Sequence, residues 1–232
     1  MAQVKQKNLE EAKAAVGRAA AELVEEGMVI GLGTGTTARY LIDALAERCR
    51  QGLTIQGVAT SEASLARAIA HGIPMLDIDE AGQIDLDFDG ADEIDPEKRM
   101  IKGGGGALLR EKMVATFASE MVVLIDESKR VGKLGRAPLP IEVVPFGHFH
   151  LEERLREMGY EPTLRRTDQG DPYTTDNGNY ILDLKLAQPL EDPEFHHLRL
   201  RTLPGVVETG LFLNLAGRVL IGHADGTVTV WE

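Results

Sequence analysis

Apolar and polar positions follow two different periods along the chain. Near the start, apolar side chains recur every three or four residues, which predicts a helix ending at Gly27. These side chains are Val16, Ala20, Leu23 and Val24. Short apolar runs beside glycines, such as 28–32, are typical of buried strands. Up to about residue 126 such runs alternate with helical patterns, which indicates βαβ units around a parallel sheet.

The predicted elements of this first part fall into two sets. The strands span 28–32, 54–60, 74–78, 84–88 and 121–126. The later helices span 38–48, 61–72 and 107–119, the second of them with a serine cap at Ser61 and a glycine stop at Gly72.

The pattern changes at Ala137–Pro145, where three prolines fall in a short stretch and suggest a domain boundary. The elements expected after it are a strand over 141–144, a helix over 149–158, strands over 161–167 and 180–186, a helix over 193–202 and a strand over 206–213. This β-α-β-β-α-β order is that of a ferredoxin-like fold. Two further short strands, 218–222 and 227–231, close the chain and are expected to return to the first sheet.

The predicted fold is therefore α/β, a Rossmann-like parallel-sheet domain with an inserted ferredoxin-like α+β domain. We place the first domain over 1–138 and 209–232 and the insertion over 139–208. An inserted domain makes self-association plausible, so oligomerisation is its expected role.

Composition and charge limit the classes of function. The chain has 232 residues, 43% of them hydrophobic and 27% charged, with a net charge of −12 from 25 basic and 37 acidic side chains. The electrostatic field of so negative a chain does not favour binding of nucleic acid. An anionic small molecule, by contrast, needs only a local pocket of N–H groups and lysines. No apolar run approaches a membrane span and no signal-peptide core is present, so no membrane partner is expected.

The cysteine content points to a reducing compartment. Cys49 is the single cysteine and cannot form an internal disulfide. We interpret it as a small buried side chain rather than a nucleophile, and we expect the protein in the cytoplasm.

Candidate chemistry gathers after the predicted strands, where ligands bind in open α/β sheets. The stretch GLGTGTT, 31–37, combines glycines with the hydroxyls of Thr34, Thr36 and Thr37 at a helix N-terminus, which favours an anion. It is neither a Walker motif nor a full dinucleotide fingerprint, and a plain strand-to-helix turn remains an alternative.

Acidic residues crowd into DFDGADEID, 87–95. We interpret Asp87 and Asp95 as parts of a solvated acidic turn. Asp89 and Asp92 are candidates to accept hydrogen bonds from sugar hydroxyls or to move protons, and a divalent cation is a second possibility, although the calcium-loop spacing is absent.

Four consecutive glycines, Gly103–Gly106, follow Lys102 and precede a predicted helix. They expose backbone N–H groups to a ligand, and the lysine supplies a positive charge. Glu111 shares a helix face with apolar side chains, and burial raises a carboxyl pKa toward the range of a general base. The apolar side chains on that face are Ala107, Leu108, Val114, Ala115 and Ala118.

Other polar candidates carry less information. Lys129, in the DESK stretch after a strand, either meets an anion or is a plain surface lysine. The pairs His148/His150 and His196/His197 have no third ligand at a familiar spacing, so we interpret them as surface or satisfied histidines and expect no metal.

Together these motifs resemble the type A ribose-5-phosphate isomerases. The similar stretches are GLGTGTT, TSEAS, DGADEID, KGGGGALLREK, DESK, TDNGN and LPGVVETGLF, so the resemblance covers essentially the whole chain. DGADEID followed by KGGGGA is the most specific of them.

The resemblance implies interconversion of ribose 5-phosphate and ribulose 5-phosphate in the non-oxidative pentose phosphate pathway, without metal, nucleotide or other cofactor. It implies that Glu111 moves a proton between C2 and C1 through an enediolate, while Asp89, Asp92 and Lys102 bind the sugar end, assist ring opening and stabilise the intermediate. The backbone of Gly90, Ala91, Gly103, Gly104 and Gly105 would lie against the sugar. Thr34, Gly35, Thr36, Thr37, Lys129 and Lys13 match the phosphate side, and the family's assemblies imply a homodimer or homotetramer.

Two other interpretations of the sequence remain open. An adenosyl-methionine methyltransferase fits VIGLGTG but lacks an acid at the end of the second strand. A non-enzymatic sugar-phosphate sensor would leave Glu111 without a role.

Overall fold

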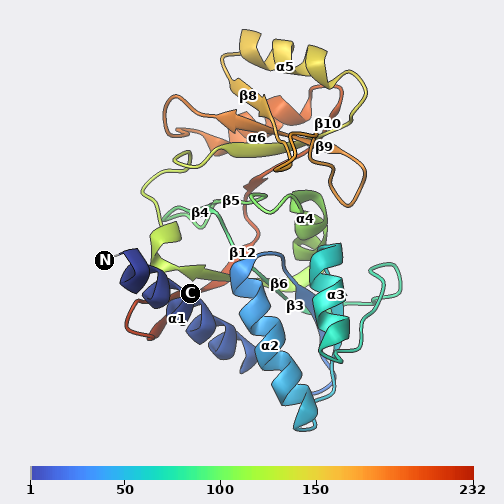
Figure 1. Ribbon diagram of the computed structural model, residues 1–232, viewed down its shortest axis with the longest axis vertical. Helices are drawn as coiled ribbons and strands as arrows, with labels where there is room; N and C mark the ends of the chain where they lie inside the picture. Colours follow the sequence, from blue (N-terminus) through green and yellow to red (C-terminus); the bar gives the residue numbers. More distant parts are fainter. Residues whose placement is uncertain (1) are drawn as a thin grey trace. The chain divides into compact units, whose positions relative to one another are not determined.

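The computed structural model describes residues 2–232, with side chains from Asn8 onward (Figure 1). The chain forms two compact units. The first contains the chain up to Ala91 together with Arg110–Lys129 and Leu215–Glu232. The second contains Asp92–Leu109 and Arg130–Asn214. The domain boundaries expected from the sequence differ from these limits and stay a prediction.

The first unit is built on a six-stranded sheet with the order β13-β12-β6-β3-β1-β2. Its strands are β1 (Val29–Leu32), β2 (Gln56–Ala59), β3 (Ile84–Asp89), β6 (Ala118–Asp126), β12 (Ala216–Gly222) and β13 (Val228–Trp231). All neighbours run parallel except β12 and β13. The strand order reverses between β1 and β3, which makes their carboxyl ends the topological switch point of the sheet.

Helices cover both faces of this sheet. They are α1 (Ala2–Ala21), α2 (Thr36–Arg50), α3 (Glu62–Ala70) and α4 (Leu108–Phe117), and the short helix η1 (Glu127–Lys129) follows β6. On one face α1 and α2 lie side by side, where Val16 and Leu41 join the core around Phe88 (Figure 1). On the other face Val114 of α4 packs with Val58 and Ile84. Because β6 is covered on both faces, its last six residues are all buried.

The second unit contains the predicted ferredoxin-like fold. Its antiparallel sheet has the order β10-β7-β9-β8. The elements are β7 (Leu139–Val143), α5 (His148–Glu157), β8 (Glu161–Leu164), β9 (Tyr180–Lys185), α6 (Pro193–Arg201) and β10 (Val206–Thr209). Leu151 and Leu155 of α5 and Leu200 of α6 join Ile141 and Leu182 of the sheet in one core. The α/β fold class with both components is confirmed.

A small three-stranded sheet was not predicted from the sequence. It consists of β4 (Glu93–Ile94), β5 (Met100–Ile101) and β11 (Leu211–Phe212) in the order β11-β5-β4. The strand predicted over 206–213 therefore divides into β10 and β11. The division falls at Gly210, whose N–H donates to Pro140 O at 2.7 Å and where a Cβ would overlap the Lys102 carbonyl.

Two other expectations were wrong. The first helix ends at Ala21 rather than Gly27, because the Arg48 guanidinium donates to the carbonyls of Ala21 and Val24 and closes the helix end. No strand spans 74–78, where backbone pairing with Gly57 involves only Pro74 and Leu76.

Replacing Phe88 by alanine is expected to lower the free energy of unfolding by about 3–5 kcal/mol, because the side chain is fully buried in the sheet core. Phe117→Ala is the matched control, since that ring is 57% exposed, and its effect should be several-fold smaller. Urea unfolding of both variants measures the difference, and equal losses would contradict the assignment of the core.

Candidate active site

The loop after β1 owes its shape to two glycines that face buried carboxylates. A Cβ on Gly31 would overlap Asp87 Oδ1, and a Cβ on Gly33 would overlap Asp89 Oδ1. Gly33 N–H donates to Phe88 O at 2.9 Å, which holds the loop against the end of β3. The glycines thus provide the space in which both carboxylates lie beside β1.

Asp89 joins the two loops at the switch point. Its Oδ1 accepts the N–H of Thr34 at 3.1 Å and the N–H of Gly90 at 2.7 Å, and the side chain has no exposed surface. Three residues predicted for the site, Thr34, Asp89 and Gly90, are therefore brought together. A carboxylate that accepts two backbone N–H bonds is fixed in orientation.

A chain of hydroxyl groups continues from Thr34 to the loop after β2. Thr34 Oγ1 lies 2.8 Å from both Thr60 Oγ1 and Ser61 Oγ. Ser61 caps α3 by accepting the N–H of Ser64, as predicted, and Ser64 Oγ donates to Gly33 O at 2.7 Å. The hydroxyl of the half-buried Thr34 therefore links the loops after β1 and β2.

The other phosphate-side residues of this loop lie at the N-terminus of α2. Gly35 is the N-cap with φ of 119°, a conformation that favours glycine, and Thr36 and Thr37 begin the helix. Thr36 is exposed and Thr37 buried. The first N–H groups of a helix attract anions, so this position suits a phosphate.

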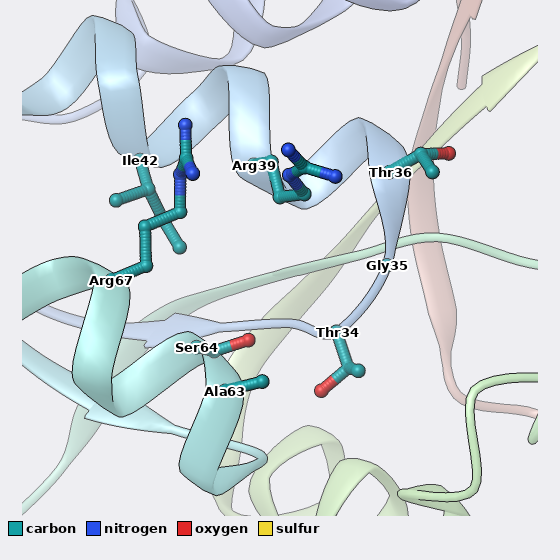
Figure 2. Close-up of a pocket in the computed structure, with 8 residues that line it drawn as sticks. All are labelled: Thr34, Gly35, Thr36, Arg39, Ile42, Ala63, Ser64 and Arg67. Carbon is teal, nitrogen blue, oxygen red and sulfur yellow. The ribbon is translucent and has the colours of Figure 1, made fainter.

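A pocket of about 410 Å³ opens beside the same loop, between α2 and α3 (Figure 2). It is lined by Thr34, Gly35, Thr36, Arg39, Ile42, Ala63, Ser64 and Arg67. Arg67 Nη2 donates to both oxygens of Asp43, at 2.6 and 2.7 Å. This ion pair largely neutralises the charge of the Arg67 guanidinium. No motif in the sequence points to Arg39 or Arg67, although Arg39 lies three positions after Thr36 and so shares its helix face.

Glu111 lies in the first turn of α4 and is only 3% exposed. Leu108, Val114 and Ala115 of the same helix are buried as well. The predicted burial of this carboxylate is confirmed. Ala118 does not belong to that helix face, because α4 ends at Phe117 and β6 begins directly after it.

The prediction of a solvated acidic turn was wrong for Asp87 and Asp95, which have 0% and 1% exposure. Asp87 lies in β3, where strand alternation directs it toward Gly31. Asp95 organises the turn after β4 by accepting the N–H groups of Glu97 and Arg99 and pairing with the Arg99 guanidinium at 2.7 Å. Both carboxylates are therefore parts of the framework.

Glu93 has a structural role that the sequence did not reveal. Its carboxylate is fully buried and accepts the N–H of Gly135 at 2.8 Å and the N–H of Arg136 at 3.3 Å. This contact ties the segment before β7 to β4, the strand that begins directly after Asp92.

Asp92 and Lys102 lie at the two ends of the β4–β5 hairpin, in the second unit. Asp92 Oδ2 accepts the N–H of Gly104 at 2.8 Å, which connects two predicted site positions. Lys102 is 3% exposed, its N–H donates to Gly210 O at 2.9 Å, and its ammonium lies 5.3 Å from the centre of the Phe212 ring. The aromatic face stabilises that buried cation.

The two remaining lysines of the predicted phosphate side belong to the first unit. Lys13 Nζ pairs with Glu10 at 2.9 Å, and the other Glu10 oxygen accepts the Tyr40 hydroxyl at 2.7 Å. These bonds, first from Tyr40 and then from Lys13, lower the pKa of Glu10. Lys129 ends the η1 helix, directly beyond the carboxyl end of β6.

The histidine pairs behave as satisfied or surface side chains, as predicted. His148 Nδ1 lies 2.9 Å from Pro145 O, His197 Nδ1 lies 2.7 Å from Thr209 Oγ1, and His150 is exposed. His196 Nδ1 lies 2.7 Å from Tyr160 Oη, and burial lowers the pKa of this imidazole. Across residues 2–232, no three His, Cys, Asp or Glu side chains are grouped as metal ligands, and no helix is long and apolar enough to cross a membrane.

Gly33→Ala is expected to displace Asp89 and to separate the loop after β1 from the loop after β3, because a Cβ has no space beside that carboxylate. We expect turnover of the chain's substrate to fall at least about tenfold, as small misplacements of positioned groups are costly. Gly82→Ala, a position open to a Cβ, is the control. Steady-state kinetics test this, and full activity in the Gly33 variant would contradict the role of the glycine.

Comparison with known protein families gives one match over most of the chain. The family model described as ribose 5-phosphate isomerase A (phosphoriboisomerase A) matches residues 56–226. A second model, described as the DeoR C terminal sensor domain, matches residues 8–72.

Individual proteins agree with the first match. A curated ribose-5-phosphate isomerase A of Protochlamydia amoebophila is 50% identical over 219 residues, 94% of each chain. The structure of ribose 5-phosphate isomerase A from Methanocaldococcus jannaschii has a TM-score of 0.91 at 41% identity and covers 96% of this chain and 99% of that one. A D-ribose-5-phosphate isomerase in complex with phospho-erythronic acid has a TM-score of 0.92 at 39% identity, covering 97% and 99%.

Proposed function

The chain belongs to the ribose 5-phosphate isomerase A family, and from that membership we propose how its residues carry out the reaction. The protein is an aldose-ketose isomerase that interconverts D-ribose 5-phosphate and D-ribulose 5-phosphate. The observation that carries the residue assignment is Glu111, a buried carboxylate in the first turn of the helix after the tetraglycine segment.

In the proposed mechanism Glu111 acts as the base. Its carboxylate removes the proton from C2 of the open-chain aldose, and the C2–H electron pair forms the C1–C2 double bond while the carbonyl electrons move to O1. The resulting enediolate takes the proton back at C1, and O2 becomes the new carbonyl oxygen as its proton moves to O1. Apolar surroundings favour proton transfer by a carboxylate near neutral pH.

Asp89, Asp92 and Lys102 are proposed to act on the sugar end. The two aspartates accept hydrogen bonds from hydroxyl groups and assist ring opening, and the Lys102 ammonium stabilises negative charge on the enediolate. Support for Asp89 comes from its fixed orientation by two N–H donors. Support for Lys102 comes from its burial, because the attraction between opposite charges is stronger where water is excluded.

The backbone and the phosphate side complete the proposed site. The N–H groups of Gly90, Ala91 and Gly103–Gly105 are proposed to lie against the sugar. The phosphate is proposed to meet Gly35, Thr36 and Thr37 at the start of α2, together with Lys129 and Lys13; Thr34, proposed for the same side, contributes by holding the loop. Because Lys13 is already paired with Glu10, its part in phosphate binding requires that ammonium to serve two partners.

Glu111→Gln is expected to reduce kcat by about 10²–10⁴-fold, the usual contribution of a positioned general base. The amide keeps the shape of the side chain but cannot accept the C2 proton. Glu22→Gln, on an exposed carboxylate, is the matched control and should keep full activity. A coupled assay of ribose 5-phosphate turnover measures both, and a Glu111 variant with more than a tenth of the wild-type kcat would argue against its role as the base.

Proton NMR of ribose 5-phosphate in D2O, with protein treated by a chelator, tests the whole proposal. We expect ribulose 5-phosphate to appear at the rate of untreated protein, with deuterium incorporated at C1 by exchange on the base. A rate restored only by added divalent metal would overturn the metal-independent mechanism. Substrate that stays unchanged in structure and isotope would overturn the isomerase assignment.

A non-catalytic sugar-phosphate sensor is the second candidate, favoured by the match of the DeoR sensor model to residues 8–72. That match ends before Asp89, Lys102 and Glu111, so it accounts for none of the proposed catalytic side chains. Binding of ribose 5-phosphate without turnover in the NMR experiment would favour the sensor.

We also infer a homo-oligomer, a dimer or a tetramer, working in the cytoplasm. Phe146 and Phe149, beside and within α5, are 93% and 61% exposed, and large apolar side chains of this kind are typical of contact surfaces. The single cysteine fits a reducing compartment. Light scattering coupled to size-exclusion chromatography determines the assembly, and a monomer at micromolar concentration would contradict it.

A further inference from the structure

Several backbone groups of the tetraglycine loop form hydrogen bonds within the second unit. Gly103 and Gly106 adopt φ of 105° and 85°, and the Gly106 N–H closes a turn onto Gly103 O at 3.0 Å. The Gly104 N–H donates to Asp92 at 2.8 Å. Because the loop has no side chains, these bonds and those to its carbonyls determine where its remaining N–H groups lie.

The carbonyls of the loop are held by two side chains from the segment between β8 and β9. Arg165 Nη1 donates to Gly103 O at 2.9 Å and to Gly104 O at 3.1 Å. Tyr173 Oη donates to Gly105 O at 3.3 Å, and its ring lies where a Cβ of Gly106 would be, 2.6 Å from two ring carbons. Three consecutive carbonyls are thus fixed by residues far along the chain.

Arg165 is itself held in place by a carboxylate of β9. Its Nε and Nη2 donate to the two oxygens of Asp183 at 2.9 and 2.5 Å, a bidentate pair whose side chains are 15% and 25% exposed. The backbone of Arg165 pairs with Ile181 and Tyr173. A guanidinium held along one edge by two hydrogen bonds has little freedom, so it presents its Nη1 group to the loop in a fixed direction.

We propose that Arg165, oriented by Asp183 and assisted by Tyr173, is a positioning residue for the isomerase reaction. By holding the Gly104 carbonyl, it fixes the peptide plane that carries the Gly105 N–H and directs that N–H toward the anionic oxygens of the enediolate. Within the described part of the chain this N–H group has no hydrogen-bond partner. The catalytic part of this inference rests on the proposed function, whereas the holding of the loop does not.

The closing experiment compares Arg165→Met with Arg166→Met. Arg166 is the adjacent arginine; it is exposed, and its guanidinium donates to the Gly170 carbonyl of its own turn, so we expect its loss to leave the tetraglycine loop untouched. Hydrogen exchange is followed on a peptide spanning 103–107. We expect Arg165→Met to speed exchange there at least about tenfold and Arg166→Met to leave it unchanged.

Steady-state kinetics and inhibitor binding test the catalytic part of the proposal. Arg165→Met should lower kcat about 10–100-fold with less than a threefold change in KM, because the N–H donor acts on charge that develops after binding. Phospho-erythronic acid, whose carboxylate carries charge at the reacting end, should lose affinity by a similar factor. Arg165→Lys should stay impaired, since an ammonium lacks the planar fork.

The outcomes separate the two claims. Unchanged exchange in the Arg165 variants overturns the inference, as does a kcat equal to that of Arg166→Met. A wild-type chain without isomerase activity overturns the proposed function, while the exchange experiment still tests the holding of the loop. If Arg165→Met does not fold, Tyr173→Phe replaces it, with a smaller rise in exchange and a kcat decrease of about threefold expected from one lost hydrogen bond.

Discussion

A carboxylate without exposed surface must find hydrogen-bond donors inside the protein, and Asp89 finds two in the N–H groups of Thr34 and Gly90. This interaction joins the loops on either side of the point where the sheet reverses its strand order. The hydroxyl chain from Thr34 then extends the connection to the loop after β2. The first unit's share of the proposed active site depends on this single acidic group and on the absence of a side chain at Gly33.

The second unit relies on the same principle with different partners. The Glu93 carboxylate accepts backbone N–H groups of the segment before β7. Glu142 is fully buried in β7, and one of its oxygens accepts hydrogen bonds at 2.9–3.1 Å from the side chains of Thr175, Asn177 and Asn179. Buried acids thus shape the loops where apolar packing offers no direction, because hydrogen bonds are directional and dispersion contacts are not. Part of the chain's excess of acidic residues therefore serves to hold its loops in place.

The fold was largely predictable because its signals are local and periodic. Strand β6 contains a continuous apolar run over 121–125, and Ser61 is a helix cap. Candidate site residues could be proposed from the sequence where a residue type has few other uses, as with four consecutive glycines or with the carboxylate of Glu111 on an apolar helix face. The end of α1 was not, since Arg48 determines it from another helix, nor was the burial of Asp87, which depends on the space beside Gly31. Arg165 gave no signal, because its partners lie about sixty positions away.

That separation has a consequence for the order of folding. The bonds from Arg165 to the loop span 62 and 61 residues, and Arg165 directly follows β8, which pairs with β9 in a hairpin. Contacts of such long sequence separation are formed late because chain entropy opposes them. On a growing or refolding chain we therefore expect the tetraglycine segment to take its shape late, with the pairing of the hairpin, and the proposed active site to be completed later than the helix that carries Glu111.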